Sequence, residues 1–490
     1  MATINFFILP NQLFETKHLK STIDDFKKQI TEKSKSKSET FTVSIILWEH
    51  PHFFTKFKFN KKKLVLHRAS MKHYFDNTLK ELEDSDEIHK RIYIEFHDKI
   101  TGKKLLSKTN TKSHYKITID PIDNVKGYTN KFNKNMMIET PNFFLTKQQY
   151  IDYRKGREPD KGFAFTNGFY PYGKKIIKHL ENTKSTDHSN RDTLKDDSKV
   201  PKIPPFENLS KDEQKYIEDA CEYVNEHFSK NYGTTEKFNF PISHTTAKFW
   251  LKDFVKERFE LFGKYQDAIV KGNYALYHSM LSSSLNIGLI NPIDVIDEIK
   301  NLDESVHKKS RIPLNSYEGF VRQLFWREYQ RYCYIHAHKL IEKTNFFGFK
   351  KRLSKKWYTG KTGIEPIDDC IIRAFDSAYL HHIERLMLIG NFMTLNRISP
   401  KQGYKWFMEF SIDSYNWVMH QNVYDMVFFN SGGVTMRKPY ITSSNYVIKM
   451  STYKSEDWSK KWNELYDSFL KDYRAKLLPY SYHFPGLRKK

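Results

Sequence analysis

The 490-residue sequence contains few cysteines and no long apolar run. Its three cysteines, Cys221, Cys333 and Cys370, lie far apart and show no Cys-x-x-Cys spacing, which excludes a disulfide framework and favours a reducing compartment. The apolar run within residues 1–14 is too short for a signal peptide, and no stretch of about 18 apolar residues occurs anywhere. We therefore expect a soluble intracellular protein without a membrane partner, located in the cytoplasm, the nucleus or a virion.

Acidic side chains are outnumbered by basic ones. The chain has 81 Lys and Arg against 58 Asp and Glu, a formal net charge of +23 and a sequence pI near 9.4. Such an excess favours a polyanionic partner, most commonly nucleic acid, although a lysine-rich solubility surface gives the same balance. Aromatic residues make up 16% of the chain, and they serve either to stack on bases and planar cofactors or to fill the core.

Glycine-rich nucleotide-binding loops of the Gly-x-Gly-x-x-Gly and Walker types are absent, yet residues 1–140 have an α/β pattern. Short β-branched and aromatic runs alternate with helical stretches such as Arg68–Leu82, which predicts a parallel sheet with right-handed crossovers. The expected strands are Ile4–Leu9, Val43–Trp48, Arg91–Phe96, Tyr115–Ile119 and Met136–Glu139. A ligand of this domain is expected beyond the carboxyl ends of the strands, near Pro10–Gln12 or Glu49-His50.

The rest of the chain divides into a connecting segment and a helical domain. Residues 141–210 form the interdomain segment, and the polar, proline-ending stretch 181–205 predicts a flexible linker. Residues 211–490 show helical periodicity almost throughout, with start signals at Asn208–Ser210, Asn291-Pro292 and Glu365-Pro366. This all-helical domain is large enough to enclose a binding site.

One stretch of the helical domain, Asp376–Phe407, combines a core stripe with a polar turn. Leu380, Ile383, Met387 and Gly390 recur at spacings of three and four residues, which predicts one helix followed by a loop at Ser399-Pro400 and a second helix. His381, His382, Glu384 and Arg385 crowd one turn of the first helix. They indicate either a polar ligand or ordinary solvated charges around one core histidine.

Four stretches of the helical half occur in the same order as in a known protein family. They are residues 262–292, 320–331, 357–393 and 407–453. In this order and in their residues the chain resembles the photolyase/cryptochrome superfamily, in particular the deoxyribodipyrimidine photolyase-related branch typified by bacterial iron–sulfur photolyases. The resemblance covers the whole chain at the level of domain order. It is specific at residues 324–331 and 357–453 and diffuse before residue 140.

The resemblance implies FAD in the helical domain, which passes an electron to damaged pyrimidines in DNA. The segment His278–Ser284 resembles the family's phosphate loop, although three serines before a helix also form an ordinary N-cap cluster. Arg385 matches an arginine beside the flavin ring, and Asp413 matches an aspartate that reaches the ribose or flavin. The full set implied for FAD is Tyr265, Ser279, Leu281, Ser282, Asn286, Arg327, Arg385, Asp413 and Asn422.

The same resemblance implies a lesion pocket and an electron route. The run Trp326-Arg327-Glu328 resembles the floor of the pocket, where a tryptophan stacks on flipped pyrimidines, although a buried Trp beside an Arg–Glu pair is also a common structural feature. Substrate contacts are expected from Trp326, Gln323, Lys438 and Tyr440. His381-His382 resembles the His-His-x-x-Arg turn of 6-4 photolyases, with His382 as proton donor. Trp406 matches a tryptophan of the chain that reduces the flavin, with Trp357 or Tyr358 as the next step of the route, or these residues only fill the core.

Several residues depart from the family pattern. The bacterial branch holds a [4Fe–4S] cluster on four cysteines, one matching Cys370, but the segment after Met450 has none, so we expect no cluster and no other metal. Met419 stands where relatives place Asn or Glu near the flavin, and a thioether is only a weak hydrogen-bond acceptor. Leu386 replaces a further histidine, and Phe407 replaces a tyrosine beside Trp406.

Three functions are therefore compatible with the sequence. The first is an FAD-dependent, light-driven photolyase that acts as a monomer on UV-damaged DNA, mainly on 6-4 photoproducts. The second is a cryptochrome-like flavoprotein photoreceptor without repair activity, which Met419 favours. The third is a basic nucleic-acid binder that has the fold but lacks flavin. The sequence leaves open an antenna chromophore of unknown identity in the N-terminal domain.

Overall fold

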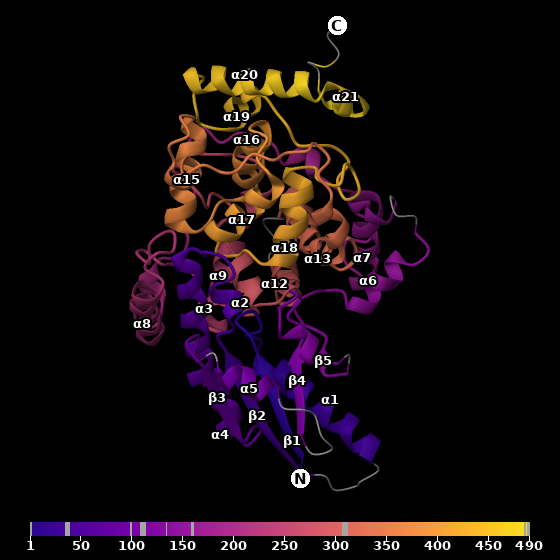
Figure 1. The fold of residues 1–490 in the computed structure, drawn as a ribbon, viewed down its shortest axis with the longest axis vertical. Coiled ribbons are helices and arrows are strands. Elements are labelled where there is room, and N and C mark those ends of the chain that lie inside the picture. The colour runs from indigo at the N-terminus through magenta and orange to yellow at the C-terminus, as the bar shows by residue number, and fades with distance from the viewer. Residues whose placement is uncertain are drawn as a thin grey trace. The chain divides into compact units, whose positions relative to one another are not determined.

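The structure is a computed structural model of the chain, and it describes residues 2–34, 40–98, 100–107, 114–133, 135–157, 161–305, 312–484 and 487. The chain forms two compact units that are discontinuous in sequence (Figure 1). Unit 1 comprises Met1–Thr146, Pro204–Lys252 and Leu281–Asp297. Unit 2 comprises Lys147–Ile203, Asp253–Met280 and Glu298–Lys490.

Unit 1 contains a five-stranded parallel sheet in the order β3-β2-β1-β4-β5, as the α/β pattern predicted. Strands β1 and β2 are buried almost continuously, because crossover helices cover both faces of a parallel sheet. Each strand lies within about two residues of its predicted position. The strands are β1 (Ala2–Ile8), β2 (Phe41–Trp48), β3 (Lys90–Ile94), β4 (His114–Ile119) and β5 (Met137–Ile138).

The helices of unit 1 connect these strands or come from the later segments. The predicted helix at Arg68–Leu82 is part of a longer helical run, α3–η1–α4, in which η1 is a π turn. Helix α8 begins at a capping box formed by Ser210 and Glu213. The helical elements are α1 (Thr16–Ser34), α2 (Pro51–Phe54), α3 (Lys61–His73), η1 (Tyr74–Thr78), α4 (Leu79–Asp84), α5 (Thr101–Ser107), η2 (Thr129–Lys131), η6 (Phe206–Asn208), α8 (Lys211–His227) and α11 (Ser282–Ile287).

Two helices extend across the boundaries between the units. They are α9 (His244–Glu257) and α12 (Pro292–Ser305). The sequence analysis assigned residues 211–490 to one helical domain, but Pro204–Lys252 and Leu281–Asp297 belong to the same unit as the sheet. Periodicity could not reveal this, because an amphipathic helix looks the same whichever core its apolar face contacts.

Unit 2 is helical and is organised around α13, a helix of 30 residues that is buried on most of its circumference. Helix α13 packs against α18, α10 and α7. The helices of unit 2 are α6 (Lys147–Arg154), α7 (Tyr170–Ile177), α10 (Phe259–Phe262), α13 (Leu314–Lys343), α14 (Lys356–Thr359), α15 (Glu365–Ser377), α16 (Asn391–Leu395), α17 (Pro400–Phe410), α18 (Asn416–Gln421), α19 (Ser444–Met450), α20 (Asp457–Asp472) and α21 (Arg474–Leu477).

Shorter 3-10 and π turns complete unit 2. The 3-10 turns are η3 (Lys161–Phe163), η5 (Asp187–Ser189) and η9 (Leu478–His483). The π turns are η4 (Phe165–Phe169), η7 (Glu384–Gly390) and η8 (Asn422–Val427). No helix in the described part of the chain is both long enough and apolar enough to cross a membrane.

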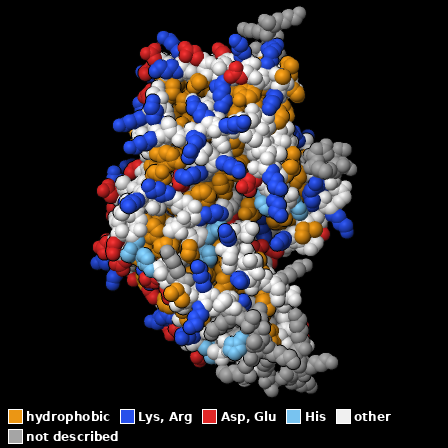
Figure 2. All heavy atoms as spheres, in the orientation of Figure 1, with side chains coloured by type: hydrophobic (Ala, Val, Ile, Leu, Met, Phe, Trp, Pro, Cys, Tyr) orange, Lys and Arg blue, Asp and Glu red, His pale blue; other side chains and the backbone are white. Residues whose placement is uncertain are grey.

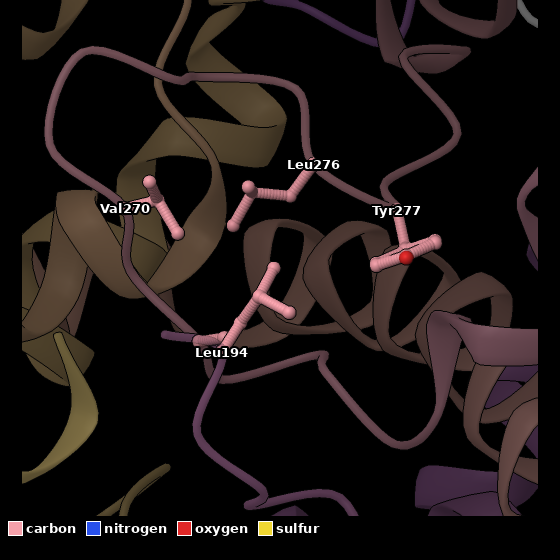
Figure 3. Packing of buried hydrophobic residues seen from close by; sticks show 5 residues of the cluster. Leu194, Val270, Leu276 and Tyr277 are labelled. Atoms are coloured by element: carbon pink, nitrogen blue, oxygen red, sulfur yellow. The ribbon is translucent and has the colours of Figure 1, made fainter. Parts of the chain in front are cut away.

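The segment 181–203, which the composition indicated as a flexible linker, packs on unit 2. The backbone N–H and hydroxyl of Thr186 both donate to Glu318 Oε2, and Asn190 Nδ2 donates to Gln266 Oε1 at 2.7 Å. Leu194 is buried in a small cluster with Val270, Leu276 and other residues of the loop 265–277 (Figure 3). The polar composition did not predict these few specific contacts, and the flexibility of the linker 181–205 stays a prediction.

The predicted single helix beginning at Asp376 is interrupted. Helix α15 ends at Ser377, Ala378 adopts a left-handed conformation with φ of 58°, and helical structure resumes only at His382. A left-handed Ala costs roughly 1–2 kcal/mol, which a sequence of good helix formers does not predict. Here Ser377 Oγ accepts the N–H of Tyr379, and Ala378 O accepts the N–H of Ile412, so local and tertiary contacts hold the break.

Side chains at the carboxyl ends of the strands form hydrogen bonds within unit 1. Asn11 Nδ2 donates to Pro121 O at 2.9 Å, and Gln12 Nε2 donates to Ile119 O at the end of β4. Glu49 is fully buried and accepts hydrogen bonds from Arg68 and from the Tyr93 hydroxyl. The positions that the general rule selected for a ligand therefore have internal partners, and an antenna chromophore stays a prediction.

Candidate functional site

Two π turns of unit 2 position the candidate site. Turn η7 contains Arg385, turn η8 contains Asn422, and the two turns pack against each other. Gly390, at the end of η7, allows the close approach, since a Cβ there would lie 2.8 Å from a methyl carbon of Val427 and 2.9 Å from Arg385 O. Single π turns within helices often occur at functional sites, because the extra residue redirects neighbouring side chains.

Arg385 forms a partly buried, bidentate ion pair. Its Nη atoms donate to the two carboxylate oxygens of Asp413 at 2.9 and 3.1 Å, and its Nε donates to Leu380 O at 2.6 Å. The Ser411 hydroxyl also donates to Asp413. Asp413 raises the pKa of Arg385 in spite of the desolvation that opposes it, so the guanidinium stays charged. The structure thus brings together two residues predicted for the flavin site, as a bidentate pair.

Three histidines converge beside this pair. The rings of His278 and His381 stack with centroids 4.7 Å apart and an interplanar angle of 16°, and the ring of His382 lies 5.4 Å from that of His278. His278 and His381 are buried, whereas the His382 side chain is 43% exposed. Burial holds the pKa values of His278 and His381 well below the usual value, so both imidazoles are neutral near pH 7.

His382 is the exposed member of this cluster, and its position fits a proton-transfer group. Its Nε2 lies 3.4 Å from Asp267 Oδ1. The opposite carboxylate oxygen of Asp267 lies 3.9 Å from Arg191 Nε. An imidazole that is accessible to a ligand and paired with a carboxylate can hold a proton and deliver it.

A second ion network lies behind the cluster. Glu384 is fully buried, its Oε1 accepts a 2.6 Å hydrogen bond from Arg373, and its Oε2 lies 3.5 Å from His381 Nε2. Arg373 also pairs with Asp369 at 2.8 Å. Cys370 donates to Glu384 at 3.7 Å, and burial raises the pKa of its thiol well above the usual value. Cys370 is therefore a protonated, structural thiol within this network.

The two tryptophans predicted for electron transfer are directly linked. Trp406 is fully buried in α17, and its Nε1 donates to Trp357 O of α14 at 2.7 Å. The Trp357 ring packs against Phe392 with centroids 5.6 Å apart. Phe407 contacts Trp406 at 5.3 Å and is also buried. The contacts are compatible both with a hopping route and with ordinary core packing.

The residues predicted for FAD are divided between the two units. Leu281, Ser282 and Asn286 belong to unit 1, whereas Tyr265, Ser279, Arg327, Arg385, Asp413 and Asn422 belong to unit 2. Helix α11 begins at Ser282. Within this helix Ser283 and Ser284 are buried, and their hydroxyls have no hydrogen-bond partner in the described structure. Unsatisfied buried hydroxyls of this kind fit a polar ligand.

Two further residues predicted for FAD have aromatic partners. The guanidinium of Arg327 lies 4.9 Å from the ring centre of Trp417, and burial lowers its pKa to about 10. Tyr265 stacks on Tyr277 with ring centroids 5.4 Å apart. Both side chains lie in unit 2, and each packs against the aromatic ring just named.

The residues predicted for the lesion pocket are partly exposed. Trp326 packs edge-on against Phe165 with centroids 4.6 Å apart, and its Nε1 donates to Asn422 Oδ1 at 3.3 Å. Gln323 is half-buried on the same helix, α13. Lys438 Nζ lies 5.6 Å from the Tyr440 ring centre, and burial with nearby Arg191 lowers the pKa of Lys438. All four residues belong to unit 2.

Sequence reasoning missed Asp267 and did not assign a role to His278. Asp267 carries no sequence signal, because it lies more than 100 residues from His382 and in no catalytic motif. His278 was visible beside the serine-rich segment, but only the tertiary structure stacks it on His381. Met419 is buried at 4% exposure, as expected for an apolar side chain. Leu386 belongs to η7, one residue after Arg385.

Comparisons with known proteins identify the family of the chain. Residues 6–240 match the family model of the deoxyribodipyrimidine photo-lyase-related protein, and residues 320–468 match the model of the FAD binding domain of DNA photolyase. The chain belongs to the photolyase/cryptochrome superfamily. The second match also supports FAD as the cofactor of the helical unit.

Individual relatives show the same relationship. The chain is 35% identical over 302 residues to the (6-4) photolyase of Agrobacterium fabrum, a match that covers 59% of this chain and 58% of the relative. The fold is similar to that of a bacterial class III photolyase from Agrobacterium tumefaciens (TM-score 0.50, 14% identity, 97% of this chain and 98% of the other). It is also similar to an archaeal photolyase from Sulfolobus tokodaii (TM-score 0.54, 11% identity, 97% and 100%).

Proposed function

We propose that this superfamily member is an FAD-dependent DNA photolyase that repairs UV-induced pyrimidine dimers, principally 6-4 photoproducts, in light. The observation that carries the proposal is the arrangement around η7. His382 is exposed and faces Asp267, while Arg385, three residues on, is 16% exposed and paired with Asp413. One turn thus has an exposed proton-transfer group and a partly buried cation that suits a flavin. The 35% identity to a (6-4) photolyase supports the lesion type.

When bound, FAD supplies a light-excited electron donor. The remaining roles belong to side chains of the chain. Arg385 and Asp413, with Tyr265, Ser279, Arg327 and Asn422 of the same unit, would hold the cofactor. The resemblance assigns Leu281, Ser282 and Asn286 to the same task. His382 would donate a proton to the damaged base, and His381 packs beside its ring. Trp406 and Trp357 would pass electrons to the flavin when light reduces it.

The lesion enters by nucleotide flipping. Trp326 provides the stacking surface for the extruded bases, and unstacking a damaged pair costs less than unstacking an intact one. Tyr440 and Gln323 hydrogen-bond the base edges, and Lys438 meets a phosphate. These substrate residues all lie in unit 2 of one chain, which supports a monomeric enzyme. The DNA partner and the +23 charge are compatible with a cytoplasmic, nuclear or virion location.

A second candidate is a cryptochrome-like photoreceptor without repair. The specific observation in its favour is Met419, a buried thioether at the position where the resemblance implies an amide or a carboxyl near the flavin. Loss of a strong hydrogen bond there changes the redox behaviour of a flavin.

Two measurements test the proposal. The visible absorption spectrum of the purified protein should contain flavin bands, and their absence would reject both flavin functions. The reduced protein is then illuminated with oligonucleotides that carry either a 6-4 photoproduct or a cyclobutane dimer, and restored bases are quantified. We expect restoration of the 6-4 substrate. Bound flavin with both lesions unchanged would favour the photoreceptor.

We propose that the enzyme contains no iron–sulfur cluster. Three cysteines cannot supply four thiolate ligands, and Cys333 and Cys370 are each fully buried in separate surroundings. Protein prepared without oxygen should contain far less than one iron atom per chain by elemental analysis. About four irons per chain would contradict the proposal.

A further inference from the structure

The three histidines of the site have a geometry that suits more than proton transfer. One nitrogen from each of His278, His381 and His382 can be chosen so that all three lie within 4.8 Å of one another. We propose that these histidines form a binding site for a divalent transition-metal ion of the zinc class. The ion binds one imidazole nitrogen from each ring and leaves a further position open.

Buried nitrogen atoms without partners are the first argument for the site. Nε2 of His278 and both ring nitrogens of His381 form no hydrogen bond with any residue that the structure describes. An unsatisfied buried polar group costs about 1–3 kcal/mol, so such groups usually have a ligand or a water. Two adjacent histidines with this property indicate a polar or charged ligand between them.

The burial of the cluster is the second argument. His278 and His381 are only 6% and 0% exposed, so bulk water does not satisfy their ring nitrogens. The side chain of His382 is 43% exposed, so an ion can reach the cluster from that side.

Carboxylates next to the ring nitrogens are the third argument. Asp267 Oδ1 lies 3.4 Å from His382 Nε2, and Glu384 Oε2 lies 3.5 Å from His381 Nε2. Carboxylates that face metal-binding histidines orient the rings and increase their basicity. The nearby arginines do not oppose a cation strongly, because Arg385 is paired with Asp413 and Arg373 is paired with Glu384.

Ligand chemistry selects the metal. Imidazole nitrogen suits Zn²⁺, Cu²⁺, Ni²⁺ and Fe²⁺, whereas Mg²⁺ and Ca²⁺ prefer oxygen. Zn–N bonds of about 2.0–2.1 Å require nitrogen atoms closer than 4.8 Å, so the rings must close by roughly 1 Å or more. His382 supplies part of this movement, because its side chain is 43% exposed. One of the two stacked rings must also turn, because the in-plane lone pairs of rings inclined at 16° do not converge on one ion.

Metal binding has a consequence for repair, and this step rests on the proposed function. A ring nitrogen that binds the ion cannot be protonated, so His382 cannot take the imidazolium form that would donate the proton. Occupancy would therefore inhibit repair without removing the flavin or the DNA. Metal binding at the site would thus inhibit proton donation by His382.

Metal titration of the full-length protein tests the site independently of repair. Protein loaded with its cofactor is treated with a chelator, dialysed, and titrated with Co²⁺ and Zn²⁺. We expect the visible d–d bands of nitrogen-coordinated Co²⁺, their loss on adding Zn²⁺, and about one Zn²⁺ per chain. No saturable binding below about 1 mM would overturn the proposal.

Matched variants locate the ion. His278→Phe keeps an aromatic ring stacked on His381 but removes a ligand, and His382→Gln removes the exposed ligand. Each should weaken Zn²⁺ binding at least about tenfold, and Asp267→Asn should weaken it by about 10- to 100-fold through the ring that it faces. The control is His336→Gln, since His336 is a partly buried histidine of α13 that packs on Tyr332. Equal affinity in all variants would place the metal elsewhere.

Repair assays separate the two proposals. If the protein repairs 6-4 lesions, saturating Zn²⁺ should abolish turnover, and a chelator should restore it, with unchanged DNA affinity and flavin spectrum. If Zn²⁺ is bound at the histidines and repair is still complete, the proposed inhibition is wrong. If no repair occurs under any condition, the proposed function fails, and the Co²⁺ spectra still decide whether the site exists.

Discussion

His382 and its partner Asp267 illustrate how single residues define this site. The imidazole is exposed on one side and paired with a carboxylate at 3.4 Å, while its neighbour His381 is fully buried. Adjacent residues in the sequence therefore have different chemistry. The exposed ring is accessible to a ligand, and burial lowers the pKa of the other ring, so it stays neutral near pH 7.

Substitution of the proton donor tests this division. His382→Ala should lower 6-4 repair by roughly 10²- to 10⁴-fold, the range for loss of a general acid, with unchanged flavin content and lesion-DNA affinity. Single-turnover repair under illumination measures the rate. The control His336→Gln should repair at the normal rate, and a normal rate in His382→Ala would remove His382 from the mechanism.

The buried imidazoles make stability dependent on pH. The folded-state pKa values of His278 and His381 are depressed, so the unfolded chain binds more protons below about pH 6.5. The unfolding free energy should be highest above that pH and fall on acidification, by about 1.4 kcal/mol per pH unit for each histidine. Urea unfolding at several pH values checks this. His278→Phe should show a shallower fall between pH 6.5 and 5, and an unchanged slope would contradict the assignment.

At the scale of elements, the site depends on places where helices depart from regular geometry. Turn η7 follows the break at Ala378, and η8 packs against it through Gly390. Helix α17 is joined to α14 by the hydrogen bond from Trp406 to the Trp357 carbonyl. Periodicity predicts that helices form in these regions, but it cannot predict where a π turn or a left-handed residue interrupts them.

The pair Trp406–Trp357 supports a prediction at this scale. Trp406→Phe should slow light-driven flavin reduction, because phenylalanine is too hard to oxidise, and should cost about 1–3 kcal/mol for the unpaired Trp357 carbonyl. Transient absorption measures the first effect and thermal unfolding the second. Trp250→Phe replaces another buried tryptophan, in α9 of unit 1, and serves as the control. Equal photoreduction rates in the two variants would exclude Trp406 from the route.

At the scale of the whole molecule, charge is the dominant feature. The net charge of +23 is spread widely, and Figure 2 shows Lys and Arg side chains over most of the visible face rather than in one patch. A dispersed positive surface attracts DNA from any direction, but only the residues that touch phosphates contribute to bound-state affinity.

Salt dependence of DNA binding tests the role of this charge. The logarithm of the association constant should fall linearly with the logarithm of salt concentration, because phosphate contacts release counterions. Lys438→Ala should reduce that slope by about one, whereas Lys256→Ala, at a side chain 81% exposed in α9, should leave it unchanged. Fluorescence anisotropy with lesion DNA provides the measurement. Binding that is independent of salt would contradict a phosphate-dominated interface.

The sequence alone determined much about this protein. The parallel sheet and its strands follow from short β-branched runs such as Val43–Trp48, and the helices follow from local periodicity and caps such as Ser210. Residues of the candidate site that lie in specific motifs, such as Arg385 and Asp413, were also predictable, and the structure pairs them. These features depend on neighbours along the chain, which a sequence records directly.

Only the tertiary structure decided how distant segments meet. It stacks His278 on His381, brings Asp267 to His382, and packs the polar segment 181–203 against Glu318 and Gln266. It also places Leu281–Asp297 in the unit of the sheet. The physical reason is that such contacts join residues 76 or more positions apart, and the packing free energy that selects them leaves no periodic pattern in either segment.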